Sequence, residues 1–281
     1  MPELPEVESI RRSLEPLIAG RRIVRAEILD PRLVQPEPAS AIAGRLAGER
    51  IATLGRRGKY LIVGMESGRS LVVHLRMTGS LRRLETGSPA DSYRRAWLEL
   101  DDGSRLDYRD VRRFGTWRLL EAGELESYLA DRLGLEPLEP AFTPEALAER
   151  LRRRRAPVKA ALLDQRTVAG LGNIYVDEAL WRARLHPARP AGSLGKSSLT
   201  RLHESIREVL EIGIARQGAT LRDYSLPDGE SGSMQREFRV YGRDGEPCER
   251  CGTAIAKTRI GGRGTWFCPR CQRRRDRRDR S

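Results

Sequence analysis

The sequence lacks any long hydrophobic run, shows no internal repeat and contains only four cysteines and three histidines. No stretch of about 18 apolar residues occurs and no signal peptide precedes the first predicted helix, so we expect a soluble cytoplasmic protein without a membrane partner. The four cysteines all lie in the last 34 residues, and their spacing suits a metal ion. This distribution excludes a disulfide framework and fits a reducing compartment.

Positive charge is what the chain has in excess. Its 281 residues include 52 Lys and Arg against 39 Asp and Glu, which gives a net charge of +13 and a pI of about 10.3. Such a balance favours a polyanionic partner, either nucleic acid or acidic lipid. No basic amphipathic helix with exposed aromatic residues is predicted, so the membrane surface is the weaker choice. The length suggests about two domains, and because nothing indicates an oligomer we expect a monomer.

The first part of the chain is predicted to form a mostly antiparallel β-sandwich or barrel with one leading helix. In residues 6–19 the apolar side chains recur with a helical period, and Gly20 provides the stop. Short apolar segments separated by turns then indicate strands, and Asp102-Gly103 is typical of a hairpin turn. The predicted strands are 23–29, 50–54, 60–65, 70–75, 96–100, 105–108 and 116–120.

The second part of the chain has helical periodicity, which makes the predicted class α+β with two main domains. Helices are predicted at 125–132, 144–155, 158–165, 173–185 and 197–217. The predicted organisation is a β-sandwich domain (1–132), a proline-containing hinge (133–142), a helical domain (143–236) with a mobile glycine-rich loop (225–235), a zinc finger (237–272) and a basic tail (273–281).

The cysteines form two C-x₂-C pairs, Cys248 with Cys251 and Cys268 with Cys271, separated by sixteen residues. This spacing matches a known zinc pattern and leaves no cysteine over. A site with four thiolates is structural, since no coordination position stays open for water. We therefore predict one structural Zn²⁺. Arg263 would lie at the tip of the hairpin between the pairs, either in contact with a phosphate or as a solvated turn residue.

The amino terminus carries the most distinctive nucleophile. A small residue at position 2 allows removal of Met1, which leaves Pro2 with a secondary amine. The pKa of an α-amine is about 7.7–8.0 against about 10.4 for lysine, so far more of it is neutral at pH 7. Attack of this amine on a sugar aldehyde carbon gives an iminium ion, which is an electron sink, and Glu3 beside it can transfer a proton. Alternatively, Pro2 and Pro5 only stiffen the start of a helix.

Three further segments combine cations with glycines or apolar side chains. Lys59 lies in a basic, glycine-containing loop, which alone is also typical of solvated surface. Met77, Arg112 and Phe114 offer the apolar wedge and cation that base-unstacking proteins insert into a duplex, although either apolar side chain alone is also typical of a core. Asn173 opens a helix after a glycine-rich turn, where free backbone N–H groups suit a phosphate.

Together, these motifs resemble those of the bacterial formamidopyrimidine-DNA glycosylase family, whose superfamily includes endonuclease VIII. The resemblance covers nearly the whole chain, from PELPEVE at residues 2–8 to the zinc motif. It implies a bifunctional DNA glycosylase and AP lyase of base excision repair, which acts on oxidised purines such as 8-oxoguanine in double-stranded DNA. It also implies a catalytic N-terminal domain, a helix–two-turn–helix in the helical domain, and association with the bacterial nucleoid.

The resemblance also implies roles for single residues. Pro2 is the Schiff-base nucleophile, and Glu3 is the proton donor to the opening deoxyribose. Lys59, in the motif RRGKY, is linked to β-elimination, and Arg263 is linked to δ-elimination and to the phosphates at the lesion. Further DNA contacts are expected from His74, Met77, Tyr93, Arg112, Phe114, Arg154, Asn173, Tyr241 and Lys257.

Within this set, Met77, Arg112 and Phe114 match the residues that fill the gap left by the extruded base, with the arginine facing the orphaned partner base. The chain departs from the family pattern at two places. Tyr93 stands where many relatives have a DNA-contacting histidine, and the tail 273–281 extends further past the last cysteine than is usual.

Two alternatives remain open from the sequence. The first is an endonuclease VIII-like preference for oxidised pyrimidines; PELPEVE and the complete wedge set favour the purine branch, but the loop 225–235 does not decide the matter. The second is a noncatalytic nucleic-acid-binding protein with a zinc ribbon and an inert amino terminus. The sequence does not rank the oxidised bases or set the preference for the opposite base.

Overall fold

The computed structural model describes all residues except 86, 90, 222–223 and 275–281, so most of the predicted basic tail lies outside the described residues. The chain divides into two compact units. The first comprises residues Met1–Ala130 and Arg216–Gln235, and the second comprises Asp131–Ala215 and Arg236–Ser281. Among the described residues, no helix is long and apolar enough to cross a membrane.

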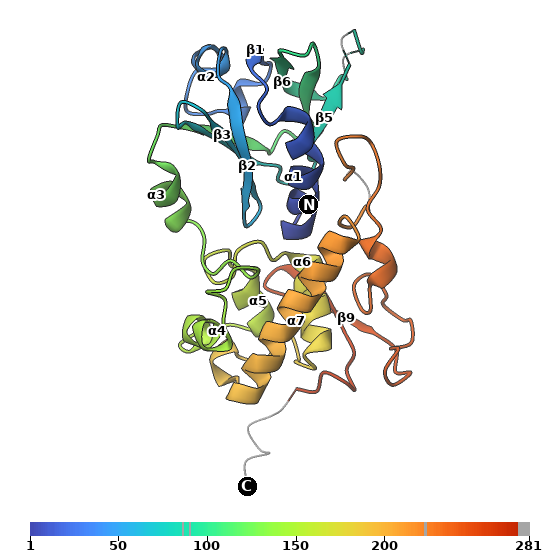
Figure 1. Ribbon diagram of the computed structural model, residues 1–281. Helices are drawn as coiled ribbons and strands as arrows, with labels where there is room; N and C mark the ends of the chain where they lie inside the picture. Colours follow the sequence, from blue (N-terminus) through green and yellow to red (C-terminus); the bar gives the residue numbers. More distant parts are fainter. Residues whose placement is uncertain (86, 90, 222–223, 275–281) are drawn as a thin grey trace. The chain divides into compact units, whose positions relative to one another are not determined.

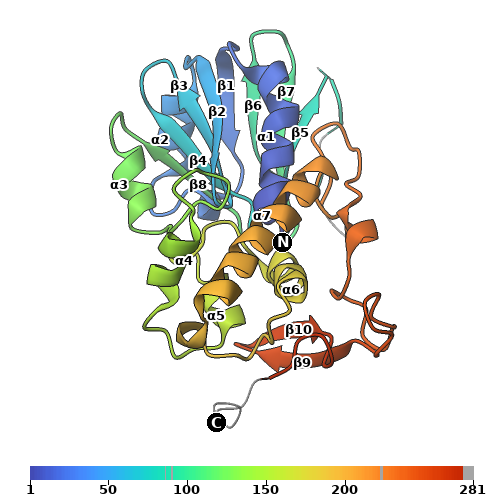
Figure 2. The same cartoon turned by 60° about the horizontal axis from the view of Figure 1, so that its bottom comes forward.

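The first unit contains two antiparallel sheets of four strands each (Figures 1 and 2). One sheet has the order β1-β6-β7-β5 and the other has the order β2-β3-β4-β8. The predicted antiparallel β architecture is therefore confirmed. The strands are β1 (Ile23–Ile28), β2 (Ile51–Arg57), β3 (Tyr60–Met65), β4 (Ser70–His74), β5 (Gly79–Leu84), β6 (Arg94–Leu100), β7 (Arg105–Asp110) and β8 (Thr116–Leu120).

The leading helix α1 (Leu4–Ile18) begins two residues before its predicted start, because Glu3 serves as its N-cap and the Glu3 N–H donates to the Glu6 carboxylate at 2.8 Å. The helix packs against β2 and β3 (Figure 2). Its apolar stripe enters the core between the sheets and contributes about 1.5–3 kcal/mol for each buried side chain. The stripe consists of Val7, Ile10, Leu14 and Ile18, each at most 1% exposed.

Two elements of this unit are absent from the sequence prediction. The edge strand β5 has the sequence GSLRRL, which shows no alternation of apolar and polar residues. Helix α2 (Ala39–Leu46) has only eight residues and buries only Ile42 and Leu46, which is too short a pattern to reveal a period. The remaining helices of the unit are α3 (Leu125–Ala130) and the 3₁₀ turn η1 (Pro31–Leu33).

Residues 216–235 belong to the first unit by their contacts, whereas the sequence groups them with the helical domain. Glu6 is the reason: its carboxylate accepts from the Ala219 N–H at 2.8 Å, and the Tyr224 hydroxyl donates to its carbonyl oxygen at 3.4 Å. Gly218 has φ +80°, and a Cβ there would lie 2.7 Å from Glu6 Cγ. The segment is therefore held on the first turn of α1.

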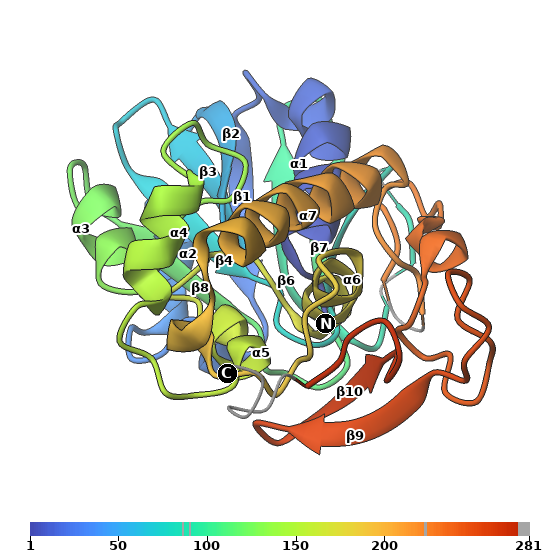
Figure 3. The same cartoon turned by 90° about the horizontal axis from the view of Figure 1, so that it is seen from below.

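The second unit is helical, with a β-hairpin near its C-terminal end (Figure 3). Helix α7 packs against α4 and α6, and β10 packs against α6. The predicted helices are all present, with ends that differ by one to four residues. The elements are α4 (Pro144–Leu151), α5 (Val158–Leu163), α6 (Asn173–Arg182), η2 (Ala191–Ser193), α7 (Lys196–Ala215), η3 (Met234–Glu237, partly in each unit), β9 (Ala256–Ile260) and β10 (Arg263–Phe267).

The connector 133–142 is tied to the second unit. The Gly134 N–H donates to the Gln165 carbonyl at 2.8 Å, and Leu135 forms an isolated parallel bridge with Val168. A Cβ at position 134 would lie 2.1 Å from the Arg166 carbonyl oxygen, so only glycine fits there. The role of this segment as a hinge stays a prediction.

Candidate active site and nucleic-acid interface

Pro2 is buried immediately before α1, and Met1 in front of it is 45% exposed. Glu3 is 3% exposed and occupies the N-cap, so the first turn of the helix fixes the backbone that carries the candidate nucleophile. Pro2 and Glu3 thus lie side by side on a rigid element, as the proposed chemistry requires.

Lys59 lies in the turn between β2 and β3, after Gly58 with φ +54°, and is 5% exposed. The strand before it is anchored to α1, because the Arg56 guanidinium pairs with Glu8 at 3.1 Å. Burial works against ionisation of Glu8, but its bonds to Arg11 and Arg12 and the charge of Arg56 bring its pKa down to about 2. This ion cluster joins the helix that carries Pro2 to the strand that leads to Lys59.

His74, at the end of β4, is 8% exposed and stacks edge-on against Tyr60 at 4.8 Å. Burial, together with the charges of Arg76 and Lys59, lowers the pKa of His74 to about 3, so the ring is neutral. Its Nδ1 accepts from the Arg76 N–H at 3.0 Å, and Arg76 has φ +54°. The ring therefore holds the turn that presents Met77; a direct contact of His74 with DNA stays a prediction.

The structure brings the three candidate wedge residues onto two joined loops. Met77 is half-buried between β4 and β5, while Phe114 is 53% exposed between β7 and β8. The Arg112 guanidinium lies over the Phe114 ring at 4.9 Å. An exposed aromatic ring capped by a cation is not a core residue, so the alternative that Phe114 packs inside the domain is wrong.

Asp110, which the sequence does not single out, joins these loops. It is 1% exposed, and its Oδ1 accepts from the Thr78 hydroxyl at 2.5 Å and from the Arg112 N–H at 3.2 Å. Its Oδ2 accepts from the Gly115 N–H at 2.8 Å, and the Arg112 N–H also donates to the Thr78 hydroxyl at 3.0 Å. Arg113 adopts φ +60° and donates to Asp30 at 2.6 Å. The loop conformation is thereby set without any ligand.

Tyr93 is 41% exposed and lies near two guanidinium groups, that of Arg109 at 4.8 Å and that of Arg95 at 5.9 Å from its ring. An exposed aromatic ring between cations can contact a sugar or a base next to a phosphate. Its contact with DNA stays a prediction.

In the second unit, Asn173 is the first residue of α6 and donates from Nδ2 to the Gly264 carbonyl at 3.0 Å. The same carbonyl accepts from Lys159 Nζ at 2.8 Å. Lys159 is fully buried and pairs with Asp177 at 2.7 Å. These bonds attach the start of α6 to the strand residue that follows Arg263. The sequence does not indicate the Lys159–Asp177 pair, because the two residues lie on different helices, eighteen positions apart.

Arg263 is exposed and begins β10, directly after Gly261 and Gly262, whose φ angles are +57° and +75°. Tyr241 and Lys257 both lie against Trp266, with the Tyr241 ring at 4.6 Å and the Lys257 ammonium at 5.0 Å from the indole. The finger thus presents a terminal arginine with a cation and an aromatic ring further along it.

One buried side chain that the sequence does not single out supports the finger. The Glu178 carboxylate, fully buried on α6, accepts from the N–H groups of Arg239, Val240 and Tyr241 at 2.9–3.0 Å. Arg154, a predicted DNA contact, pairs with Asp164 at 2.8 Å. The latter pair leaves the guanidinium partly exposed, and its contact with DNA stays a prediction.

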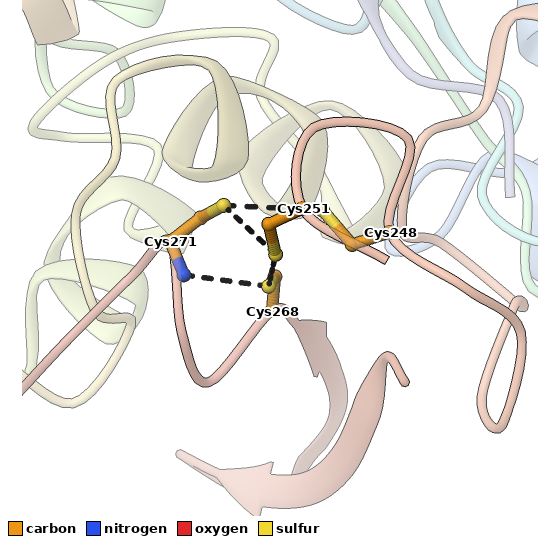
Figure 4. Close-up of side chains that lie close together, drawn as sticks. All are labelled: Cys248, Cys251, Cys268 and Cys271. Carbon is orange, nitrogen blue, oxygen red and sulfur yellow. Dashed lines mark hydrogen bonds between the residues drawn. The ribbon is translucent and has the colours of Figure 1, made fainter. Parts of the chain in front are cut away.

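The four cysteines converge at the base of the finger (Figure 4). Their Sγ atoms all lie within 4.8 Å of one another, and Cys251 lies 3.5 Å from both Cys268 and Cys271. In a tetrahedral site with Zn–S bonds of about 2.3 Å, the sulfurs are about 3.8 Å apart. The cluster therefore fits one zinc ion, as predicted.

A buried glutamine braces this site. Gln272 is fully buried, and its Oε1 accepts from the Cys268 N–H at 2.8 Å while its Nε2 donates to the Leu185 carbonyl at 2.9 Å. The zinc loop is thereby joined to the segment that follows α6. This brace fixes the backbone of one ligand residue, Cys268.

Comparison with known proteins agrees with this geometry. Three family models match: the formamidopyrimidine-DNA glycosylase N-terminal domain over residues 1–117, the H2TH domain of the same enzyme over 133–225, and the zinc finger found in this enzyme and in isoleucyl-tRNA synthetase over 245–274.

Curated relatives match over 89% or more of their length. The formamidopyrimidine-DNA glycosylase of Chloroflexus aggregans is 47% identical, with 97% of this chain and 98% of the relative covered. That of Symbiobacterium thermophilum is 50% identical, with 97% and 89% covered. A solved structure of a Lactococcus lactis variant with DNA containing Fapy-dG has a TM-score of 0.92 at 41% identity, covering 97% of this chain and 100% of the other. The chain therefore belongs to the formamidopyrimidine-DNA glycosylase family and is a base excision repair DNA glycosylase.

Proposed function

We propose that this protein removes oxidised purines from double-stranded DNA through a Schiff base to Pro2 and then cleaves the strand by β- and δ-elimination. The observation that carries the proposal is the position of Pro2. It precedes the capped, buried start of α1 and lies beside Glu3, behind an exposed Met1. Related solved structures contain DNA with Fapy-dG, an N7-benzyl-Fapy-dG or an abasic site, which supports the same class of substrate here.

The proposed reaction starts with the neutral secondary amine of processed Pro2. Its nitrogen forms a bond to C1′ of the lesion nucleotide, and the N-glycosidic bond breaks as the damaged base leaves with a proton. Glu3 protonates the sugar ring oxygen, the C1′–O4′ bond opens, and the nitrogen lone pair forms the iminium ion. Since the iminium acidifies C2′, loss of a C2′ proton expels the 3′ phosphate, and a second elimination expels the 5′ phosphate. Hydrolysis of the remaining iminium ion frees Pro2.

We assign the cations to the phosphates. Lys59 and Arg263 would hold the phosphates that become leaving groups and stabilise their charge. Asn173, at the start of α6, would bind the DNA backbone at the N-terminus of that helix. Tyr93, His74, Arg154, Tyr241 and Lys257 complete the proposed contact set. Binding to DNA would also keep the protein associated with the nucleoid.

We assign Met77, Arg112 and Phe114 to the space that the extruded base leaves. Extrusion costs a few kcal/mol, which inserted apolar side chains and phosphate contacts offset. Phe114 is exposed and its loop is already ordered, so insertion requires little further ordering.

The zinc ion has a supporting role in this proposal. Cys248, Cys251, Cys268 and Cys271 would hold it and thereby fix the hairpin at whose tip Arg263 lies. With four thiolate ligands the ion would keep no open coordination position, so its contribution would be structural.

The test is covalent trapping with borohydride on duplexes that contain 8-oxoguanine opposite cytosine. Wild-type protein is expected to form a trapped complex, and Pro2→Gly is expected to lose it, as is protein whose Met1 cannot be removed. Pro5→Ala serves as the matched control, because it removes a proline from the same helix turn without changing the terminal amine. Normal trapping and cleavage by Pro2→Gly would refute the assignment.

A second candidate is a preference for oxidised pyrimidines. One related structure, of the Lactococcus lactis enzyme, contains DNA with an oxidised pyrimidine, which shows that a relative can hold such a base. Cleavage of 8-oxoguanine and thymine-glycol duplexes under single-turnover conditions separates the two candidates. We expect the purine lesion to react faster.

A further inference from the structure

A second basic site lies in the helical unit, at the opposite end of α6 from Asn173. A cavity of about 1420 Å³ is bordered by the segment after α6, the first turn of α7 and two loops of the zinc finger. Among the described residues, no aspartate or glutamate lines it. Seven cations do: Arg184, Arg189, Lys196, Arg201, Arg250, Arg270 and Arg273.

Three of these cations donate hydrogen bonds to uncharged acceptors, so these bonds do not neutralise their charge. Arg201 donates to the Ser197 hydroxyl at 2.7 Å, Arg250 to the Trp181 carbonyl at 2.6 Å, and Arg273 to the Arg270 carbonyl at 3.3 Å. All three acceptors are uncharged. The zinc centre, with four thiolates around a divalent ion, adds two negative charges at one border of the cavity. Seven cations exceed that charge, so the cavity stays strongly positive.

We infer that this cavity binds the phosphates of a second nucleic-acid segment, separate from the DNA held at the proposed active site. Its volume exceeds the range of about 300–1000 Å³ that is usual for small-molecule pockets. Besides cations it offers serine hydroxyls and the first N–H groups of α7, which are the usual partners of phosphate oxygens. An extended phosphodiester chain fits these features better than a compact anion does.

The position of the cavity gives this binding a function. Helix α6 has ten residues and is therefore about 15 Å long, and it separates Asn173 at its start from Arg184 beyond its end. A protein that binds phosphates at both ends of one rigid helix can contact two DNA segments at once. It can then pass directly from one segment to another during the search for damage, without first dissociating into solution.

The test is the release of undamaged, fluorescently labelled duplex from the full-length protein, followed by stopped flow at increasing concentrations of unlabelled duplex. Direct transfer makes the release rate rise in proportion to the competitor, whereas simple dissociation gives a constant rate. Wild-type protein is expected to show the rise. The triple variant Arg184→Gln, Arg270→Gln and Arg273→Gln is expected to lose at least four-fifths of this slope.

The matched control removes three exposed arginines from the first unit, by Arg21→Gln, Arg22→Gln and Arg25→Gln, and is expected to keep the wild-type slope. A wild-type rate that is independent of competitor, or equal slopes in all three proteins, would overturn the inference. So would a polyglutamate competitor that accelerates release as strongly as DNA, because it would show a general anion site.

Borohydride trapping on lesion-containing duplex, measured on the same samples, separates this inference from the proposed function. The triple variant is expected to trap normally, since none of its three positions belongs to the proposed active site. Loss of trapping in wild-type protein would contradict the proposed function and leave the transfer measurement unaffected. The salt dependence gives a second readout: the log–log slope for binding of the second duplex should fall by about 2.7, at about 0.9 for each phosphate contact removed.

Discussion

The loops that carry Met77 and Phe114 depend on one buried hydroxyl, so Thr78→Val is the perturbation that best tests the wedge. Thr78 is 6% exposed; its hydroxyl donates to Asp110 Oδ1 and accepts from the Arg112 N–H. Valine has nearly the same shape but forms neither bond. Leaving a buried charged acceptor without one donor costs about 1.5–3 kcal/mol. Because this energy holds both loops together, the fraction of molecules with ordered loops should fall.

If the full penalty of about 1.5–3 kcal/mol destabilises the state in which the wedge residues are inserted into the duplex, extrusion of the base slows by about 10- to 150-fold. The assay is single-turnover excision of 8-oxoguanine from a paired duplex, together with β-elimination at an abasic site in single-stranded DNA. The second substrate has neither a base to extrude nor a partner base to orphan, so we expect its rate to change by less than about threefold. A merely unfolded protein would lose both activities.

Asp107→Asn is the matched control for a companion variant, Asp110→Asn. Both aspartates are buried on β7, but Asp107 pairs with Arg105 at 2.6 Å and does not contact the loops. Asp110→Asn should reproduce the selective defect, whereas Asp107→Asn should change stability alone. Equal loss of duplex excision and single-strand cleavage in Thr78→Val would refute the reasoning. Excision by Thr78→Val at the wild-type rate would refute it as well.

Three other predictions concern single residues. Cys251→Ser should release zinc and abolish DNA cleavage, measured by metal analysis and strand nicking; activity without bound zinc would contradict the structural role of the site. Phe114→Ala should reduce excision from duplex about tenfold or more while total DNA affinity changes less, measured by single-turnover kinetics and titration; equal losses on damaged and undamaged duplex would count against insertion. The pKa of His74 is about 3 in the folded protein and about 6.5 when unfolded, so the unfolded state binds the extra proton and stability falls as the pH drops below 6.5. His74→Asn, which cannot titrate, should lose about 2 kcal/mol less than wild type between pH 7 and 5 in urea unfolding; parallel curves would show that the ring is not buried and neutral.

Much of the fold follows from local sequence patterns. The apolar period of α1, the spacing of the strands and the change to helical periodicity near residue 125 predict both units, because each element buries one face. The zinc site is predictable because the four ligands come in two close pairs whose spacing is itself the signal. Where the local pattern is weak, as in α2 and β5, prediction fails.

Some residues of the candidate site can be predicted from the sequence, and others cannot. Pro2, Lys59 and Phe114 stand out in the sequence because each is an unusual residue for its place: a proline next to the terminal methionine, a lysine entering an apolar strand, an aromatic ring in a basic loop. Asp110, Lys159 and Gln272 do not stand out, since a single polar residue has no periodic signature.

What those three residues do becomes visible only when distant segments meet. Asp110 joins loops that are more than thirty positions apart, and Lys159 reaches Gly264 across 105 positions. Local sequence motifs therefore identify the residues that are proposed to react, whereas tertiary contacts determine how rigidly these residues are held. Since catalysis depends on the groups being held in place as well as on their identity, variants of the buried polar residues should impair the reaction while every group that contacts DNA is retained.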